Sequence, residues 1–457
     1  MKKFKKVLAL SLALAMGLSL VACNGGGDTT APTTPDDGGD TTAAASGEGE
    51  TFYIYVWNNE YRDLMAKYMP GYTADEDNMG GYMEDGTRIQ FVENENANMN
   101  YQNKLDEALT DGSQVDMFLV EADYAVKYTS AEAGVAMDVK ELGFTDDDLA
   151  NYYSYVNQVV TDENGVVRGV SWQAAPGFMI YNADIAEEVL GARDPETVQA
   201  AVADWDKFEE TAGKMDAAGY DMVADYQEGS RVFNAARSTP WVQDGVITVP
   251  AEIDEWTDMA KGWYDNGYMT GGAMWSSDEW KNGHRGGVFC YFGCTWYLIW
   301  SMDEQVAGED VKWNICQGPA AYYWGGTWLC AGANCTNPEL AYEIMYTMTA
   351  DVDVATEIAK GELNFPANKA AAEAVASENF DVGRAWLECE NYFGFCKEAA
   401  DQIEVQNMTP YDQMIEKYQE AMGDYFNGNV ATKEDALANF YATVTEMWPA
   451  LEAPAAE

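Results

Sequence analysis

The chain has 457 residues, with 26 Lys or Arg against 77 Asp or Glu, so its formal net charge is −51 at neutral pH. So acidic a surface repels a polyanion, which excludes nucleic acid as a partner. Single hydrophobic cores stop growing at roughly 250–300 residues, so the length indicates two lobes and therefore a cleft between them.

The first 23 residues have the pattern of a lipoprotein export signal. Lysines at positions 2, 3, 5 and 6 precede an apolar run over residues 7–21, which leads through small residues to Cys23. The run is too short for a lasting membrane span, and small residues before a cysteine suit a lipoprotein signal peptidase. We expect residues 1–22 to be removed and Cys23 to carry the lipid, palmitate included. An ordinary secretory signal is the alternative.

Residues 23–50 are dominated by Asp, Thr, Pro, Gly and Ala. Such a segment has almost no apolar surface to bury, so we expect a flexible linker. The mature protein would then be anchored by lipid to the extracytoplasmic face of the cell membrane.

The folded part is expected to begin with a buried strand over residues 51–57, a run of β-branched and aromatic residues. Further strands are expected at residues 88–92 and 115–120. Helices are expected at residues 101–110 and from about Tyr124. This alternation of strand and helix predicts an α/β fold with parallel strands.

Two later helices are predicted from their first residues. Asn337 followed by Pro338 is typical of a helix start, with an N-cap and a proline in the first turn. Thr432 begins a pattern like a capping box, and apolar residues then recur at helical spacing. Those residues are Leu437, Phe440, Tyr441, Val444 and Met447.

Metal and disulfide chemistry find little support in the sequence. After Cys23, seven cysteines remain, so at least one thiol stays free. No CxxC pair is present and His284 is the only histidine, which does not suit a zinc site. Residues 75–80 resemble the start of a calcium loop, but Gly86 stands where a glutamate is needed, so they predict a surface turn. We expect no metal and no cofactor.

Several segments together resemble the sugar-binding family of extracellular solute-binding proteins of ABC importers, which includes maltose-binding protein. Each segment alone is weak, but their order and spacing cover almost the whole mature chain. The segments are Val115-Asp-Met117, Gly169-Val-Ser-Trp172, Met179-Ile-Tyr-Asn182, Gly286-Gly-Val-Phe289, Gly293-Cys-Thr-Trp296, Gly318-Pro319, Gly325-Gly326, Asn337-Pro-Glu-Leu-Ala-Tyr-Glu343 and Phe365-Pro-Ala-Asn-Lys369.

The resemblance implies a two-lobed periplasmic-binding-protein-like fold, in which crossing hinge segments join the lobes around a ligand cleft. The amino-terminal lobe would hold residues 51–170 and 319–375, and the carboxy-terminal lobe residues 171–318 and 376–450. The hinges would lie near residues 172–176 and 318–319. The partners implied are a carbohydrate ligand and the permease subunits of the transporter. The protein would be a monomer, and it would bind its ligand without acting as an enzyme.

Fifteen tryptophans and 28 tyrosines supply candidate ligand contacts. Pyranose rings stack on aromatic planes, while their hydroxyls need polar donors and acceptors. Trp296 stands where the family's Gly-x-x-Trp pattern places a sugar-stacking ring, although Cys294 and Thr295 differ from the asparagine-glycine-proline sequence that is commoner in the family. The alternative is a core tryptophan.

The other candidates follow strand ends or hinges. Ligands in open α/β sheets lie beyond the carboxyl ends of the strands. For the polar candidates, the alternative to a ligand contact is a place in a solvent-exposed loop. Trp172 and Trp324 either face the cleft or pack the hinge. Trp241 and Trp275 lie in segments that do not align with the family. The candidates are Trp57, Asn58, Glu60, Glu121, Asp123, Trp172, Trp324 and Tyr411.

Two other functions stay open. A surface hydrolase acting on glycans would need two opposed carboxylates, which so acidic a sequence can supply. No Gly-x-Ser-x-Gly elbow is present, and His284 is expected to be an exposed residue rather than a catalytic one. A ligand-sensing protein that signals to a receptor is the other alternative.

Overall fold

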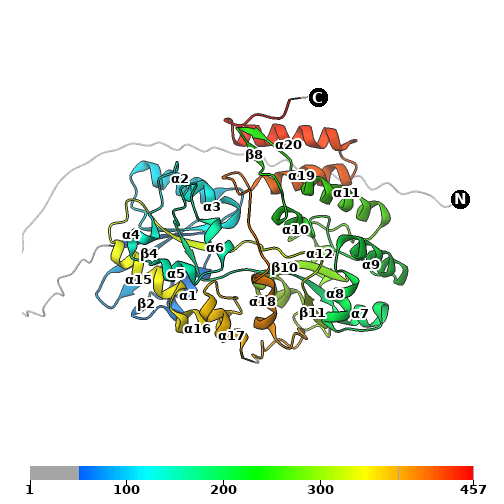
Figure 1. The fold of residues 1–457 in the computed structure, drawn as a ribbon, viewed down its shortest axis with the longest axis horizontal. Coiled ribbons are helices and arrows are strands. Elements are labelled where there is room, and N and C mark those ends of the chain that lie inside the picture. The colour runs from blue at the N-terminus through cyan, green and yellow to red at the C-terminus, as the bar shows by residue number, and fades with distance from the viewer. Residues whose placement is uncertain (1–50, 379, 456–457) are drawn as a thin grey trace, which may run out of the picture. The chain divides into compact units, whose positions relative to one another are not determined.

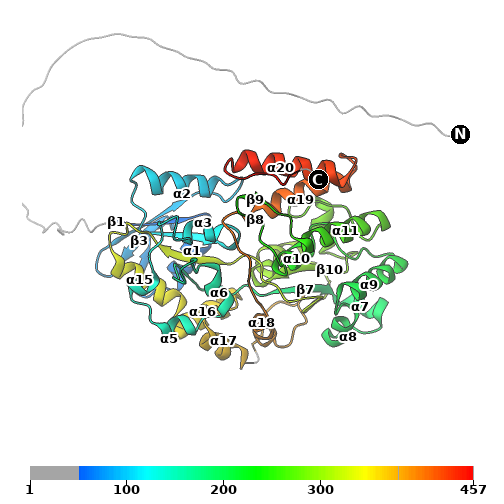
Figure 2. The same cartoon turned by 45° about the horizontal axis from the view of Figure 1, so that its top comes forward.

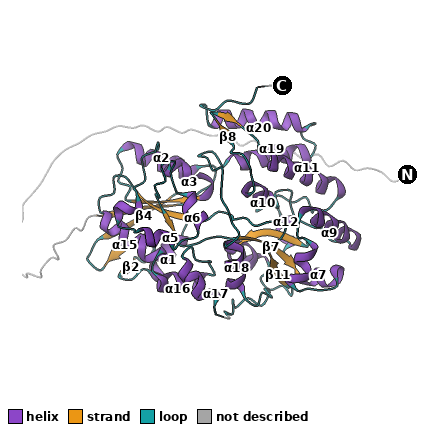
Figure 3. Ribbon diagram, viewed as in Figure 1, coloured by secondary structure: helices purple, strands orange, loops and turns teal. Residues whose placement is uncertain are grey.

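The computed structural model describes residues 51–378 and 380–455. These residues form an α/β fold in which two separate sheets are each surrounded by helices (Figures 1 and 3). The predicted α/β class is therefore confirmed. The predicted signal peptide, Cys23 and the linker lie outside the described residues.

The larger sheet belongs to the first lobe. Its strands, in sheet order, are β2 (Tyr72–Ala74), β3 (Gly80–Met83), β4 (Arg88–Glu93), β1 (Thr51–Val56), β5 (Met117–Glu121), β12 (Thr327–Ala331) and β6 (Val170–Ser171). Strand β1 pairs in parallel with β4 and β5, as predicted. Strand β12 runs antiparallel to both β5 and β6.

Burial explains the central position of β1 and β5. Phe52, Ile54 and Val56 of β1 are buried, and β5 is buried along nearly its whole length, because helices cover both faces of the sheet. The helices of this lobe are α1 (Glu60–Tyr68), α2 (Asn100–Asp111), η1 (Ala122–Tyr124), α3 (Ala125–Thr129), α4 (Val139–Leu142), α5 (Asp146–Ala150), α6 (Ser154–Val159), α15 (Pro338–Thr349), α16 (Val352–Glu362) and α17 (Lys369–Ala376).

The smaller sheet belongs to the second lobe and is antiparallel, in the order β10 (Cys290–Cys294), β7 (Gly177–Asn182) and β11 (Trp313–Cys316). Strands β8 (Val242–Gln243) and β9 (Val246–Ile247) form a separate ribbon. The surrounding helices (Figure 2) are α7 (Ala183–Leu190), α8 (Pro195–Ala201), α9 (Trp205–Ala218), α10 (Ser230–Ala235), α11 (Ala251–Asn266), α12 (Asp278–Gly283), α13 (Thr295–Tyr297), the π-helical turn η2 (Leu298–Met302), α14 (Asp303–Gln305), α18 (Tyr392–Ala400), α19 (Met414–Phe426) and α20 (Lys433–Met447).

The two helix starts read from the sequence are confirmed. Helix α15 begins at Pro338, and the Asn337 side chain accepts a hydrogen bond from the Leu340 amide at 3.1 Å. Helix α20 begins after Thr432, whose hydroxyl accepts from the Asp435 amide at 3.1 Å. Both caps satisfy amides that the helix itself leaves without partners.

Two connections carry the chain between the strands of the two sheets, and a third leads from α17 of the first lobe to α18 of the second. Residues 172–176 lead from β6 to β7, and residues 317–326 lead from β11 back to β12. They lie side by side, because Pro176 and Tyr323 form an antiparallel bridge and the Trp324 amide donates to the Ala175 carbonyl at 3.2 Å. Hinge motion at these crossings and the residue boundaries of the lobes stay predictions.

The described residues contain neither a disulfide, nor a group of side chains suited to a metal ion, nor a helix suited to spanning a membrane. Their seven cysteines are free thiols, and none of their His, Cys, Asp and Glu side chains form a group of three or more suited to a metal ion. Residues 75–79 form the turn between β2 and β3, where the Asn78 amide donates to the Asp75 carbonyl. Within the same part of the chain, no helix is both long and apolar enough to cross a membrane.

Candidate ligand-binding cleft

Three strand ends meet at one edge of the larger sheet. The carboxyl ends of β1 and β5 lie there because these strands are parallel, and the amino end of β12 lies there because β12 is antiparallel to β5. Trp57 and Asn58 follow β1, Glu121 ends β5, and Gly326 precedes β12. The topology therefore brings segments far apart in the sequence to one place, as in other open α/β sheets.

A cavity of about 240 Å³ lies at this edge, and we call it the central cavity. Its walls come from the larger-sheet lobe, from both crossing connections and from the segment after β10 of the smaller sheet, so it lies between the lobes. The lining residues are Trp57, Asn58, Glu60, Glu121, Gln173, Trp296, Trp300, Gly325, Gly326 and Thr327.

Trp296 forms the aromatic wall that the second lobe contributes. Its indole Nε1 donates to the Trp324 carbonyl at 2.9 Å, which fixes the ring orientation. The Trp324 ring meets it edge-on with centroids 5.3 Å apart, and Trp275 lies roughly parallel to it at 6.1 Å. Trp296 is only partly buried and lines the cavity, so the packing leaves part of the indole available to a ligand.

Gly325 allows the crossing connection to approach this wall closely. Its φ of +65° is one that residues with a side chain rarely adopt. A Cβ atom there would lie 3.3 Å from Glu121 Oε1 and 3.4 Å from Trp296 Nε1. Glycine at this position therefore keeps both the backbone turn and the space between the carboxylate and the indole.

Gln173 gives the central cavity a buried acceptor without a donor. Gln173 is 3% exposed; its Nε2 donates to Thr327 Oγ1, but its Oε1 has no hydrogen-bond partner within the described residues. Burial, and then the neighbouring Asp123 carboxylate, raise the pKa of Glu121 well above its ordinary value. Burial also raises the pKa of Glu60 to about 7, an effect that Asn364 partly offsets.

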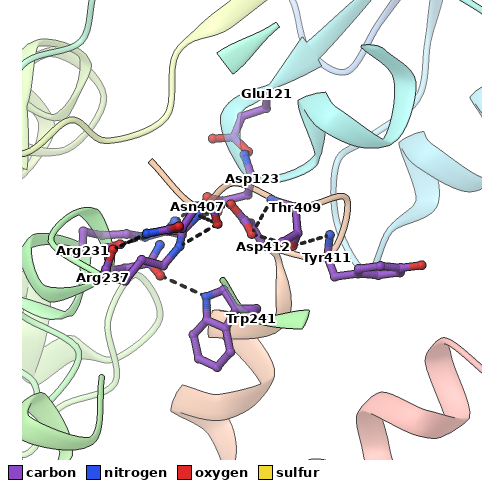
Figure 4. A network of polar contacts seen from close by, with 10 residues as sticks. Glu121, Asp123, Arg231, Arg237, Trp241, Asn407, Thr409, Tyr411 and Asp412 are labelled. Atoms are coloured by element: carbon purple, nitrogen blue, oxygen red, sulfur yellow. Dashed lines mark hydrogen bonds and ion pairs between the residues drawn. The ribbon is translucent and has the colours of Figure 1, made fainter. Parts of the chain in front are cut away.

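An ion pair joins the lobes beside the cavity (Figure 4). Arg231 on α10 donates through Nη1 to both carboxylate oxygens of Asp123, at 2.7 and 2.6 Å. Its guanidinium also lies 5.6 Å from the centroid of the Trp324 ring. Deeper in the second lobe, Arg237 pairs with Asp412, whose carboxylate accepts from Thr409. Both arginines are thus paired with carboxylates of the protein.

The structure brings most of the predicted site residues to the cleft. Trp57, Asn58, Glu60, Glu121 and Trp296 line the central cavity. Their roles in binding stay predictions, because the placement establishes only that they face the same space.

The remaining predicted residues lie beside the cavity or away from it. Trp324 packs against Trp296, and Asp123 is engaged by Arg231. Trp172 is 2% exposed and stacks on Tyr61 with centroids 5.4 Å apart, so it packs the hinge rather than lining the cavity. Tyr411 packs edge-on against Trp448 at 5.8 Å and does not line the central cavity.

The expectation that His284 is exposed was wrong. The residue is buried, its ring stacks on Tyr291 at 3.9 Å, and its Nε2 lies 3.0 Å from the Tyr297 hydroxyl. Burial lowers its pKa to about 4, so the ring is neutral at ordinary pH. The sequence neighbours of position 284 are polar, so they gave no sign of the aromatic cluster that α12, β10 and α13 form around it in the fold.

Sequence reasoning missed Gln173, Arg231 and Trp300 at the cleft, and it named Trp275 only as a tryptophan in a segment that does not align with the family. Gln173 and Arg231 gave no signal, because their roles depend on contacts with distant segments. Trp275 and Trp300 are 43% and 52% exposed, which is unusual for tryptophan. Trp300 follows Trp296 by four residues, a spacing that places side chains on one helix face and could have indicated it.

The comparisons with known proteins come from sequence and from structure. The family model of the bacterial extracellular solute-binding proteins matches residues 81–381, which is more than half of the chain. A comparison with curated proteins gives no match. Solved structures of low sequence identity share the fold over nearly the whole described part.

Three of these structures illustrate the likeness. An extracellular solute-binding protein of family 1 aligns with a TM-score of 0.70 at 16% identity, over 87% of this chain and 99% of that chain. A binding protein of an ABC transporter from B. animalis subsp. lactis Bl-04, in complex with beta-1,6-galactobiose, gives 0.63 at 18% identity, over 89% and 100%. Maltose-bound MalE3 of T. maritima gives 0.60 at 13% identity, over 87% and 100%.

These likenesses confirm the two-lobed fold, and the matched family model confirms the resemblance stated from the sequence. The chain belongs to the bacterial extracellular solute-binding protein family.

Proposed function

We propose that this protein is the lipid-anchored substrate-binding component of an ABC importer and that it captures a neutral carbohydrate, specifically an oligosaccharide. The observation that carries the proposal is the central cavity, where three tryptophans share the walls with Gln173, whose buried amide oxygen has no hydrogen-bond partner within the described residues. A pyranose has apolar faces for the rings and hydroxyls for the polar groups.

The charges favour a neutral ligand over an anionic one. Glu60 and Glu121 line the central cavity, and no Lys or Arg is among its lining residues. Because the pKa of Glu60 is raised to about 7, its carboxyl group can either donate or accept a hydrogen bond near neutral pH. A sugar hydroxyl, which is both donor and acceptor, suits such a group.

The relatives support the same ligand class. The similar proteins from B. animalis subsp. lactis Bl-04 and T. maritima were solved with beta-1,6-galactobiose and with maltose. Because the identities are below 20%, the particular sugar does not transfer to this chain.

The lipid anchor is proposed from the sequence alone. Small residues before Cys23 and the polar segment that follows fit a processed lipoprotein. Mass spectrometry of the native protein should find a mature N-terminus at a lipid-modified Cys23. A chain cleaved elsewhere without lipid would contradict the anchor but not the binding function.

A melting screen tests the binding function against its rivals. Mono- to tetrasaccharides are added to the mature protein, with galacturonic acid and choline as charged comparisons. We expect a rise in melting temperature with neutral oligosaccharides and a much smaller rise for Trp296→Ala. A response to charged compounds alone would contradict the proposal. Release of product from a chromogenic glycoside would favour the surface hydrolase. Sugar binding by the protein, without any effect of the protein on sugar uptake, would favour the ligand-sensing alternative.

A further inference from the structure

A cavity of about 550 Å³ lies in the second lobe and shares no lining residue with the central cavity. Its walls come from residues 193–195 at the start of α8, from β11, from residues 388–391 and from α18, and we call it the α18 cavity. Small-molecule sites usually measure about 300–1,000 Å³, so this cavity has room for a ligand of the size of a monosaccharide.

Asn314 gives the α18 cavity a buried donor that the protein leaves unused. The residue lies within β11, is 4% exposed and lines the cavity. Its Oδ1 accepts from the Ile315 amide at 2.8 Å, but its Nδ2 donates to no acceptor within the described residues. Asparagine is depleted in strands, and buried polar groups are nearly always hydrogen-bonded. The exception calls for an acceptor from outside the protein.

Two exposed carboxylates line the same cavity. Glu390 precedes α18 and Glu398 lies on it. No Lys or Arg within the described residues forms an ion pair with either side chain, whereas Glu388 is engaged by Arg193. Both carboxylates therefore have their full charge available to a ligand.

Arg193 is the cation among the lining residues, and its donors are already used. Its Nε and Nη2 donate to the two carboxylate oxygens of Glu388 at 3.0 and 3.1 Å. Its Nη1 donates to Glu187 at 2.9 Å, and Nη2 also donates to Asp184 at 2.8 Å. Four carboxylates and this one guanidinium line the cavity, so its potential is negative and favours a cation over an anion.

Phe395 on α18 adds an aromatic wall. It lines the cavity, is only partly buried and meets Phe178 edge-on, with ring centroids 5.8 Å apart. The face of an aromatic ring attracts an ammonium group. Phe395 thus supports the same kind of ligand as the carboxylates do.

We propose that the α18 cavity binds a small organic cation that carries both an ammonium group and an oxygen acceptor, the amino alcohol class to which amino sugars belong. The ammonium group pairs with Glu390 and Glu398, and a ligand oxygen accepts from Asn314 Nδ2. The carboxylates alone would attract any cation, and the unused amide donor adds the requirement for the oxygen. This inference goes beyond the proposed function and does not depend on it, because it concerns a separate cavity.

Calorimetric titration of the mature protein at low ionic strength tests the site with three probes. D-Glucosamine has the ammonium group and the oxygens, N-acetyl-D-glucosamine has the oxygens without the charge, and cyclohexylamine has the charge without an oxygen. We expect D-glucosamine to bind at least about tenfold more tightly than N-acetyl-D-glucosamine and roughly threefold to tenfold more tightly than cyclohexylamine, the latter being the value of one hydrogen bond.

Two variants separate the donor from the charge. Asn314→Leu removes the amide donor with little change in volume, so it should weaken D-glucosamine roughly threefold to tenfold and leave cyclohexylamine unchanged. Glu398→Gln should weaken both cations and leave oligosaccharide binding unchanged. Glu434→Gln is the matched control, because it removes an exposed carboxylate on α20 that does not line the cavity, and it should change neither. Should Asn314→Leu fail to fold, Glu398→Gln still tests the site, since an exposed side chain supports little core.

The contrary outcomes are distinct. Equal weakening by Glu398→Gln and Glu434→Gln would show unspecific attraction of a cation to an acidic protein and overturn the inference. Equal affinity for D-glucosamine and its N-acetyl derivative, or no measurable binding of D-glucosamine, would overturn it as well. Binding that Trp296→Ala abolishes and Glu398→Gln spares would place the amino sugar in the central cavity instead. None of these results decides the carbohydrate function, which the melting screen tests separately.

Discussion

Trp296 combines a fixed orientation with a partly open face, as expected of a ligand-stacking ring. Because it lines the cavity rather than filling the core, Trp296→Ala should weaken sugar binding by at least about 2 kcal/mol, or more than roughly thirtyfold. Titration calorimetry of the binding oligosaccharide measures this. Near-normal affinity together with a large drop in melting temperature would instead assign Trp296 to the core.

A core tryptophan provides the control for that experiment. Trp256 on α11 is fully buried, so Trp256→Ala should cost about 3–5 kcal/mol of folding stability through the cavity it leaves. The fraction that remains folded should bind sugar normally, which separates loss of packing from loss of ligand contact.

Gly325→Ala should impair both the fold and the site. The positive φ makes the backbone strained by about 1 kcal/mol with any side chain, and the new Cβ would crowd Glu121 and Trp296. Gly267→Ala at the end of α11 is the matched control, because Gly267 also has a positive φ but open space around it. Melting should detect a loss in both variants, whereas affinity should fall only in Gly325→Ala.

Glu60 gives the stability a defined pH dependence. Its pKa is about 7 in the folded protein against an ordinary value of 4.5, so between these values the folded state binds more protons than the unfolded state. Its contribution therefore decreases as the pH rises through this window. Asp225 and Glu228, with pKa values raised to about 7 and about 8, act in the same direction.

Glu60→Gln removes one of these contributions. Urea unfolding at pH 5 and pH 8 should show a smaller fall in unfolding free energy for the variant than for the wild type. The remaining fall reflects the other carboxyl groups with raised pKa values, among them Glu121, Asp225 and Glu228. An unchanged difference between the two pH values would mean that the Glu60 carboxyl titrates normally.

At the scale of elements, α10 is tied to η1 by the pair of Arg231 with Asp123. Both side chains are largely buried, with 15% and 12% exposed. Arg231→Met would leave the Asp123 carboxylate beside Glu121 without its cation, at a cost of up to about 3 kcal/mol. Adding Asp123→Asn should recover most of that loss. Denaturation of the four proteins of this double-mutant cycle measures the coupling, and purely additive losses would show that the pair contributes none.

The sequence predicted best what depends on local pattern. Strands β1, β4 and β5 and the caps Asn337 and Thr432 follow from alternation, helical spacing and capping chemistry, and the residues after β1 and β5 follow from the rule on strand ends. Local pattern could not show that Arg231 reaches Asp123, or that Gln173 shares a cavity with Trp296. Those contacts depend on how two connections cross between the sheets.

The same limit explains why local pattern left Trp172 and Trp324 undecided and misjudged the burial of His284. Trp172 and Trp324 have similar sequence surroundings near crossing segments, yet Trp172 is stacked on Tyr61 under the hinge and Trp324 supports the ring of Trp296. His284 lies among polar residues in the sequence but inside an aromatic cluster in the fold. Burial of a single side chain is set by elements that arrive from elsewhere in the chain.

At the scale of the whole molecule, the described residues form two lobes, joined at residues 172–176, at residues 317–326 and between α17 and α18, with the central cavity between them. We expect crossings such as these to offer little resistance to rotation, so that a ligand contacting both lobes would favour a closed arrangement. Sugar capture and lobe closure are thus one event in this account.

Crystal structures of the mature protein with and without a binding oligosaccharide test that account most directly. We expect a pyranose on Trp296 in the central cavity and lobes closer together than in the sugar-free crystal. A sugar bound outside the central cavity, or one held with no aromatic ring of the cleft against it, would contradict the proposed function.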